Sequence, residues 1–163
     1  MLLELEAALK AAGDPTRTRI LKLLEAGPLC VCQVQAVLGL APSTVSKHLT
    51  LLRAAGLVTD RRDGRWIHYA LATEERNPYA RAVLALLRGP LDREPRILED
   101  RRRLRSVKAV PVEALCALPP AERAPSRLVQ VETTRPARPD SGCSGNLPSR
   151  SCRTAIPASS TRR

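Results

Sequence analysis

The stretch from residue 28 to residue 52 constrains the fold most, because it contains two amphipathic segments joined by a glycine turn. Apolar residues of the first segment recur at three- and four-residue steps, as on one helix face: Val31, Val34, Val37 and Leu38. Gly39 predicts the end of this helix, since glycine accepts the left-handed conformation found at helix ends. Pro42 suits the first turn of a second helix, where a missing N–H costs nothing.

The second helix is expected to have one apolar side and one side of short polar residues. Val45, Leu49 and Leu52 form the apolar side. The polar residues are candidates for contact with DNA: Ser43, Thr44, Ser46, Lys47 and His48. Two helices joined by a short glycine turn are typical of the helix-turn-helix, whose second helix enters the major groove. An ordinary amphipathic helix would show the same pattern, so the next segment decides between the two interpretations.

A basic β-hairpin is predicted after these helices. Asp63-Gly64 is a strong tight-turn dipeptide, and the residues from 66 to 71 alternate as they do in a strand. Three arginines lie near the expected tip of the hairpin: Arg61, Arg62 and Arg65. A basic hairpin in this place is typical of the wing of a winged helix. The sequence therefore predicts a mainly α winged helix-turn-helix with a small β-hairpin, which binds double-stranded operator DNA.

Other helices are expected on both sides of this unit. Asp14-Pro15 opens one of them, with an N-cap followed by a first-turn proline. We interpret Arg17, Arg19 and Lys22 in this helix as a solvated face.

Two further apolar helices are expected at residues 2–12 and 77–88, and a single winged helix has little interior left for them. We expect them to form the interface of a homodimer, with these apolar candidates: Leu2, Leu5, Leu9, Val83, Leu86 and Leu87. A dimer also suits a palindromic operator that is read in adjacent major grooves.

Charge and composition divide the chain into three parts. Of the formal net charge of +11, only +4 lies in residues 1–90, which we expect to be the DNA-binding and dimerisation domain. Residues 91–118 are rich in Arg and Glu, and we expect a helical extension there. Residues 119–163 are rich in Pro, Ser and Arg and predict a disordered basic tail, in which Cys143 and Cys152 are expected to be spectators.

The composition also limits the class of protein. No apolar run is long enough to span a bilayer, and the acidic N-terminus does not resemble a signal sequence, so we expect a cytoplasmic protein without membrane contact. Thiols in a reducing compartment are more often ligands than disulfides. The chain lacks both a Cys-x-x-Cys redox motif and a Cys/His nucleophile arrangement, so no enzyme is expected.

Cys30 and Cys32 lie on the helix just before the expected DNA-reading helix, and a pair of soft thiol ligands in that place suggests a sensor. In five pieces the chain resembles the ArsR/SmtB family of metal-sensing repressors: residues 14–17, 29–32, 43–49, 52–58 and 63–66. The Leu-Cys-Val-Cys piece resembles the branch that responds to arsenic and antimony. The resemblance implies a dimeric winged-helix repressor that binds DNA in the apo form and releases it when As(III) or Sb(III) binds the cysteines.

The chain departs from relatives of that branch at Gln35, where a third cysteine often stands. Cadmium- and lead-responsive relatives carry cysteines near the N-terminus, but no cysteine precedes Cys30 here. Zinc-responsive relatives carry His and acidic ligands on the last dimer helix, and residues 77–88 contain no His, Asp or Glu. Cys116 is therefore a candidate third ligand, provided that the extension folds back or crosses to the other subunit.

In a regular helix, residues two apart are separated by about 200° around the axis. Cys30 and Cys32 could then share one ligand atom only if the start of their helix unwound, which would move the DNA-reading helix. Two alternatives keep the DNA binding: a thiol redox switch that uses Cys116 or another subunit, and a response to another soft metal ion. A protein-binding adaptor without a DNA role is a further alternative.

Overall fold

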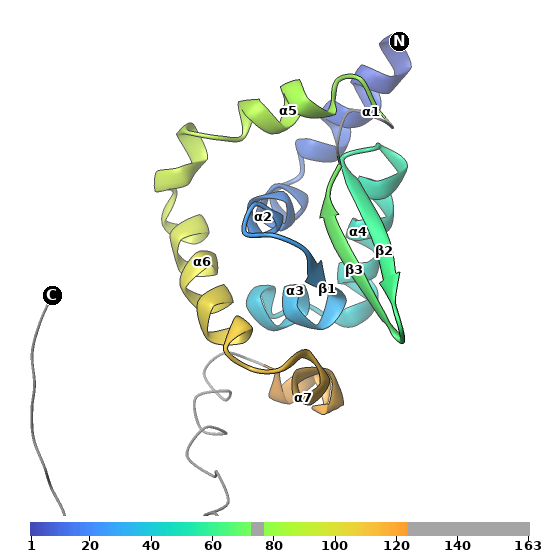
Figure 1. Cartoon of the computed structure of the whole chain (residues 1–163). Coiled ribbons are helices and arrows are strands. Elements are labelled where there is room, and N and C mark those ends of the chain that lie inside the picture. The colour runs from blue at the N-terminus through green and yellow to red at the C-terminus, as the bar shows by residue number, and fades with distance from the viewer. Residues whose placement is uncertain (73–76, 124–163) are drawn as a thin grey trace, which may run out of the picture.

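The computed structural model of the chain describes residues 1–72 and 77–123 (Figure 1). The elements follow in this order: α1 (Leu2–Ala12), α2 (Pro15–Leu24), β1 (Leu29–Cys30), α3 (Val31–Leu38), α4 (Pro42–Ala54), β2 (Val58–Asp63), β3 (Trp66–Leu71), α5 (Ala80–Leu86), η1 (Pro90–Arg93), α6 (Pro95–Lys108), α7 (Val112–Ala117) and η2 (Pro120–Glu122), where η1 and η2 are 3₁₀ helices.

The helix-turn-helix is confirmed as α3 and α4. Gly39 ends α3 in the left-handed region at φ 68°, and Pro42 occupies the first turn of α4. The apolar side of α4 is completely buried, because Val45, Leu49 and Leu52 each have 0% exposure. The glycine turn sets the direction of α4, and the burial of its apolar side leaves its polar side facing solvent.

The hairpin is confirmed as β2 and β3, which pair antiparallel across a turn in which Gly64 has a φ of 56°. A third strand, β1, was not expected. It pairs antiparallel with β3, with Cys30 opposite His68, so the sheet order is β1-β3-β2. The first cysteine is thereby held by the base of the wing.

The helices of residues 91–118 share the core of the winged helix. α6 packs against α2 and α3, and α7 packs against α3 (Figure 1). Leu104, Val107 and Leu115 are 3%, 0% and 0% exposed, and they belong to the same apolar cluster as the residues of α2, α3 and α4. The extension therefore brings its last helix back to the start of α3.

The interpretation of the α2 cations as a solvated face is wrong. Arg17 donates from Nε to the carbonyl of Ala11 at 2.6 Å and from Nη2 to that of Lys10 at 2.8 Å. Arg19 forms a bidentate ion pair with Asp100 of α6, with distances of 2.7 and 2.8 Å. These partners lie in other elements, so the two arginines tie α2 to its neighbours.

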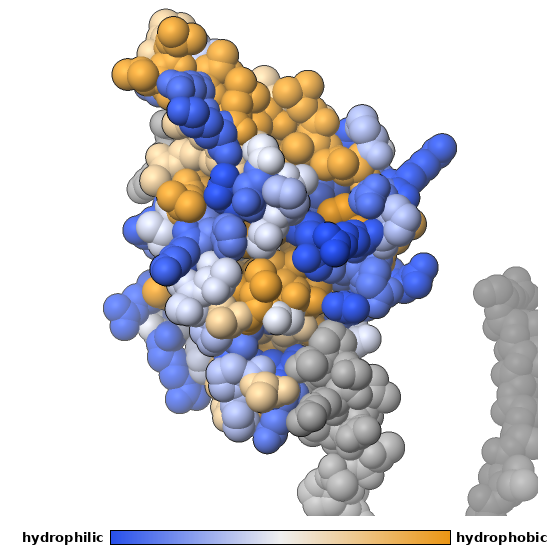
Figure 2. Space-filling model, turned by 180° about the vertical axis from the view of Figure 1, so that it is seen from behind, coloured by the Kyte–Doolittle hydropathy of each residue, from blue (hydrophilic) through white to orange (hydrophobic). Residues whose placement is uncertain are grey.

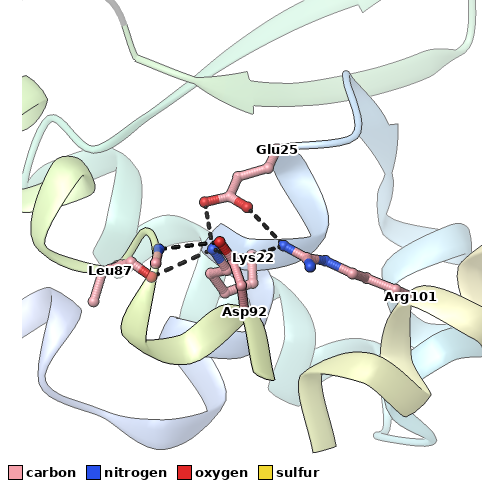
Figure 3. Close-up of polar contacts among 6 residues, drawn as sticks. Lys22, Glu25, Leu87, Asp92 and Arg101 are labelled. Carbon is pink, nitrogen blue, oxygen red and sulfur yellow. Dashed lines mark hydrogen bonds and ion pairs between the residues drawn. The ribbon is translucent and has the colours of Figure 1, made fainter. Parts of the chain in front are cut away.

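Lys22 differs most from expectation, since only 2% of it is exposed. Figure 3 shows it among Glu25, Leu87, Asp92 and Arg101. Its Nζ lies 2.7 Å from Glu25 Oε1 and 2.9 Å from Asp92 Oδ1, and it also donates to the Leu87 carbonyl. Arg101 binds the same two carboxylates. Lys22, followed by Arg101, holds the pKa of Asp92 well below its usual range. A buried cation needs such partners.

The first residues of the tail that was predicted from residue 119 lie within the described part of the chain. Residues 120–122 form η2, and Arg123 is held by hydrogen bonds, whereas residues 124–163, including Cys143 and Cys152, lie outside the described residues. Within the described parts of the chain, no helix combines the length and apolar character needed to cross a membrane.

Candidate thiol site and DNA-binding surface

Cys30 is the N-cap of α3 rather than a residue within it. Its backbone is extended, with φ −83° and ψ 163°, and its side chain accepts the N–H of Gln33. In return the Cys30 N–H donates to Gln33 Oε1 at 3.0 Å, which completes a capping box with sulfur in the place of the usual hydroxyl. This cap fixes the direction of the Cys30 thiol.

Cys116 lies on α7 and completes a group of three thiols within one chain. The sulfur atoms of Cys30, Cys32 and Cys116 all lie within 4.8 Å of one another. Cys30 is buried and the other two are half-buried. Among the described residues, these form the one group of three or more His, Cys, Asp or Glu side chains arranged to hold a metal ion. All donors in it are soft, which favours soft ions.

The thiols of this group differ in acidity. The hydrogen bond with Cys32, followed by burial, raises the pKa of Cys30. The same hydrogen bond lowers the pKa of Cys32, because the Cys30 thiol donates to the Cys32 thiolate. Burial raises the pKa of Cys116. Cys32 is thus the most acidic of the three thiols.

The expectation that α3 must unwind before both cysteines can reach one atom is wrong. It assumed that Cys30 and Cys32 both lie inside a helix, whereas the helix begins at Val31. An extended residue followed by a first-turn residue brings the two sulfurs to the same side. The site is preformed, and it includes Cys116 of the same chain.

The predicted DNA-contacting residues of α4 divide into two groups. Ser43, Ser46 and Lys47 are exposed, and Thr44 is half-buried. Thr50 is also exposed and was not predicted, although its spacing from Ser46 and Lys47 places it on the same helix face.

His48 turns away from this face. It is half-buried, its Nδ1 lies 3.8 Å from Asp14 Oδ1, and that nitrogen has no hydrogen-bond partner among the described residues. Asp14 in turn caps α2 by accepting the Arg17 N–H at 2.9 Å. The structure thus places His48 between α4 and the start of α2, in a different position from the other candidates.

The three arginines of the wing are exposed around its tip. Arg62 donates from Nε to the Gly64 carbonyl at 3.1 Å, and the Arg65 guanidinium lies 4.9 Å from the centre of the Trp66 ring. Arg61, which pairs with His68 across the sheet, and Arg65 are both exposed. This arrangement suits contact with phosphates on either side of a groove.

The candidate dimer residues lie at one end of the molecule, where apolar side chains gather on the surface (Figure 2). Leu2, Leu9 and Leu86 are 78%, 45% and 68% exposed, and Leu5 and Leu87 are half-buried. Val83 differs from the others: it is 2% exposed and packs in the core of its own chain.

Sequence reasoning missed two residues beside the thiols. Gln35 Oε1 accepts a hydrogen bond from Arg123 Nη1 at 2.7 Å, and Arg123 Nη2 donates to the Cys116 carbonyl at 3.0 Å. No local pattern marks Arg123, because its role depends on a partner 88 residues away.

The central part of the chain matches a known protein family. Residues 14–60 match the family model described as bacterial regulatory protein, arsR family. These residues include the cap of α2, the first two cysteines, the helix-turn-helix and the start of the wing.

Two curated relatives illustrate the match. The arsenical resistance operon repressor of Escherichia coli (strain K12) is 45% identical over 64 residues, which cover 39% of this chain and 55% of that protein. An HTH-type transcriptional regulator of Methanocaldococcus jannaschii is 46% identical over 66 residues, which cover 40% of this chain and 74% of that protein. The chain thus spans little more than half the length of the first relative.

A solved structure of a homodimeric winged helix-turn-helix DNA-binding domain from Mycobacterium bovis is 29% identical, with a TM-score of 0.49. The match covers 58% of this chain and 83% of that domain. The family and these relatives are regulators rather than enzymes, in agreement with the expectation from the sequence.

Proposed function

Because the chain belongs to the arsR family of bacterial regulatory proteins, we propose that it is a metalloid-responsive transcriptional repressor. The apo homodimer binds operator DNA and releases it when As(III) or Sb(III) binds Cys30, Cys32 and Cys116. One observation carries the proposal: three sulfur atoms lie within 4.8 Å of one another at the start of the helix that precedes α4. The resistance role of the Escherichia coli relative supports arsenic as the inducer.

The acidity of the three thiols suits trivalent arsenic. Arsenite is the neutral acid As(OH)₃ at neutral pH, and As(OH)₃ with three thiols gives As(SR)₃ and three molecules of water. Each departing hydroxide takes up one thiol proton, or leaves as free hydroxide where Cys32 is already a thiolate, so no proton is released and no electron is transferred. The raised pKa of Cys30 and Cys116 therefore does not oppose the binding of arsenite.

The proposed set of ligands can be tested by thiol protection. One equivalent of arsenite per chain should protect Cys30, Cys32 and Cys116 from an alkylating reagent and leave Cys143 and Cys152 reactive, as read by peptide mass spectrometry. Equal labelling of all five cysteines with and without arsenite would contradict the proposal.

The same acidity predicts a pH dependence that separates arsenite from a divalent soft ion such as Cd²⁺. A cation must displace the protons that Cys30 and Cys116 retain because their pKa values are raised. Below those pKa values, two displaced protons should raise the Cd²⁺ affinity about 100-fold per pH unit as the pH increases. With Cys32 ionised, arsenite binding sets free one hydroxide, so the arsenite affinity should fall by up to about tenfold per pH unit over the same range. Competition titrations at several pH values measure both slopes, and equal slopes would contradict this account of the site.

A redox response is the second candidate, and the lowered pKa of Cys32 beside Cys116 favours it. The Cys32 thiolate would cleave the O–O bond of hydrogen peroxide to give a sulfenic acid and hydroxide, which takes up a proton from solvent to become water. The Cys116 thiol would then attack that sulfur, forming a disulfide and releasing a second water. Release of operator DNA by peroxide in the absence of metalloid would favour this candidate over the first.

We propose that the exposed residues of α4 and the wing tip form the DNA-binding surface. The fold presents Ser43, Ser46 and Lys47 on one side of α4, and two wing arginines to solvent. The exposed leucines of α1 and α5 form the proposed dimer interface, since a cluster of exposed apolar side chains usually marks a surface that another protein covers. Val83 is excluded from this interface by its burial.

The wing should contribute to DNA affinity by neutralising phosphates. The double variant Arg61→Ala/Arg65→Ala should bind DNA more weakly, and the slope of log K against log salt should become shallower by about 0.9 for each phosphate that is no longer neutralised. Fluorescence anisotropy at several salt concentrations measures this slope. The matched control is Arg102→Ala/Arg105→Ala, which removes two exposed arginines from α6, on the side of the molecule away from the wing (Figure 1). Equal slopes for the two variants would contradict a DNA role for the wing.

A further inference from the structure

The chain that follows α7 is fastened to α3 by Gln35 and Arg123, which we call the clasp. Arg123 donates to three acceptors: Leu118 O at 2.9 Å, Cys116 O at 3.0 Å and Gln35 Oε1 at 2.7 Å. Gln35 Nε2 donates back to Pro120 O at 3.4 Å. Gln35 is 4% exposed, so its amide forms these bonds within the protein rather than with solvent.

The clasp bears directly on the third thiol. α7 has only six residues and is too short to be stable without tertiary contacts. Leu115, which has 0% exposure, anchors one side of it in the core. Cys116 is the next residue, and its own carbonyl accepts from Arg123. An apolar anchor and a hydrogen-bonded carbonyl on consecutive residues together fix where the Cys116 sulfur lies.

The same segment faces the turn of the helix-turn-helix across a cavity. Pro120 and Ala121 of η2 line this cavity of about 330 Å³ together with Gln35 and the turn residues 39–42. Pro42 begins α4, the proposed DNA-reading helix. The chain that holds Cys116 therefore packs on α3 and faces the start of α4 across the cavity.

We infer that Gln35 and Arg123 are positioning residues that hold the Cys116 thiol beside Cys30 and Cys32 and connect the thiol group to the turn before α4. This inference rests on the proposed function for its role in regulation, but the positioning itself is independent of any inducer. Metalloid binding at Cys116 would pull on a segment that faces this turn across the cavity.

Dibromobimane tests the positioning without a metalloid, because it becomes strongly fluorescent only after two nearby thiols have each displaced a bromide. The parent variant is Cys30→Ser/Cys143→Ser/Cys152→Ser, in which Cys32 and Cys116 remain. We expect the parent to be bridged, and Arg123→Ala or Gln35→Ala in that background to lower the rate of bridging about tenfold or more, since hydrogen bonds to a charged group are removed. Gln35→Glu keeps an acceptor for Arg123 and should restore bridging.

The control is Arg102→Ala, an exposed arginine of α6, which should bridge like the parent. Circular dichroism melting curves verify that each variant folds. A parent that is not bridged, an Arg123→Ala variant that is bridged like the parent, or a failure of Gln35→Glu to restore bridging would overturn the inference. Because no metalloid is present, these results are distinct from failure of arsenite to release DNA, which would count against the proposed function.

Discussion

Cys30→Ser and Cys32→Ser should each leave DNA binding intact and abolish the response to arsenite. Serine is a good N-cap, so the capping box that starts α3 should survive the loss of the Cys30 sulfur. A hydroxyl is a poor ligand for a soft centre. Loss of a direct ligand should cost more than the roughly 10- to 100-fold that loss of a supporting partner of a ligand costs. We therefore expect arsenite affinity to fall by at least about 100-fold, or about 2.7 kcal/mol.

The near-ultraviolet absorption of arsenic–sulfur bonds measures this affinity, and anisotropy measures DNA binding by the same samples. Cys143→Ser/Cys152→Ser is the matched control, which removes two cysteines outside the group and should behave like the wild type. If Cys32→Ser bound arsenite as tightly as the wild type, the ligands would have to lie elsewhere.

Asp100→Ala should have the largest effect on stability among the polar substitutions considered. Asp100 has a 3% exposed side chain and receives two hydrogen bonds from Arg19, whose side chain is 21% exposed. A guanidinium stays protonated in proteins even without an acidic partner, so Arg19 keeps its charge after Asp100 is removed. Removing one partner of a buried pair costs about 3–5 kcal/mol, and the partial exposure of Arg19 places the expected loss near 3 kcal/mol.

Urea unfolding followed by circular dichroism measures the change in free energy of unfolding. The control is Glu99→Ala, which breaks exposed ion pairs on the same helix and should cost less than about 1 kcal/mol. Arg19→Met/Asp100→Leu, which replaces both charges with apolar side chains, should recover most of the loss. A loss below about 1 kcal/mol for Asp100→Ala would show that the ion pair does not hold α6 to α2.

The parts of the fold that the sequence predicted are those specified by local chemistry. Gly39 and Pro42 define the helix-turn-helix because their backbone preferences act on their own position. Asp63-Gly64 likewise defines the tip of the wing. The exposed polar side of α4 follows from the burial of its apolar side. The exposure of Ser43, Ser46 and Lys47 could therefore be predicted from the pattern of this helix alone.

The parts that the sequence could not predict depend on distant partners or on a single boundary residue. Arg19 is tied to Asp100, 81 positions later, and no spacing rule connects them. The position of Cys116 depends on how α6 crosses α3, so it remained one possibility among several. The mechanism that required unwinding failed because the helix begins one residue after Cys30. Helix boundaries are uncertain by a residue or two from sequence, and here that uncertainty decided the geometry of the site.

Because the three thiols already lie together, ligand binding would contract the site and would not need to unwind the start of α3. A ligand that bonds all three sulfurs must draw them together from separations of up to 4.8 Å. Cys30 is held by β1 and the cap of α3, whereas Cys116 is held by α7 and the clasp. Contraction therefore acts between the start of α3 and the segment that faces the turn before α4 across a cavity. This is how binding at the thiols could favour a conformation with lower affinity for DNA.

The most direct test of this account is the fluorescence anisotropy of labelled promoter DNA bound to the purified chain during titration with arsenite. We predict release of the DNA near one arsenite per chain, and no release from the variant Cys30→Ser/Cys32→Ser/Cys116→Ser. Retention of the DNA by the wild type at saturating arsenite would contradict the account, as would equal release of DNA by the wild type and the triple variant.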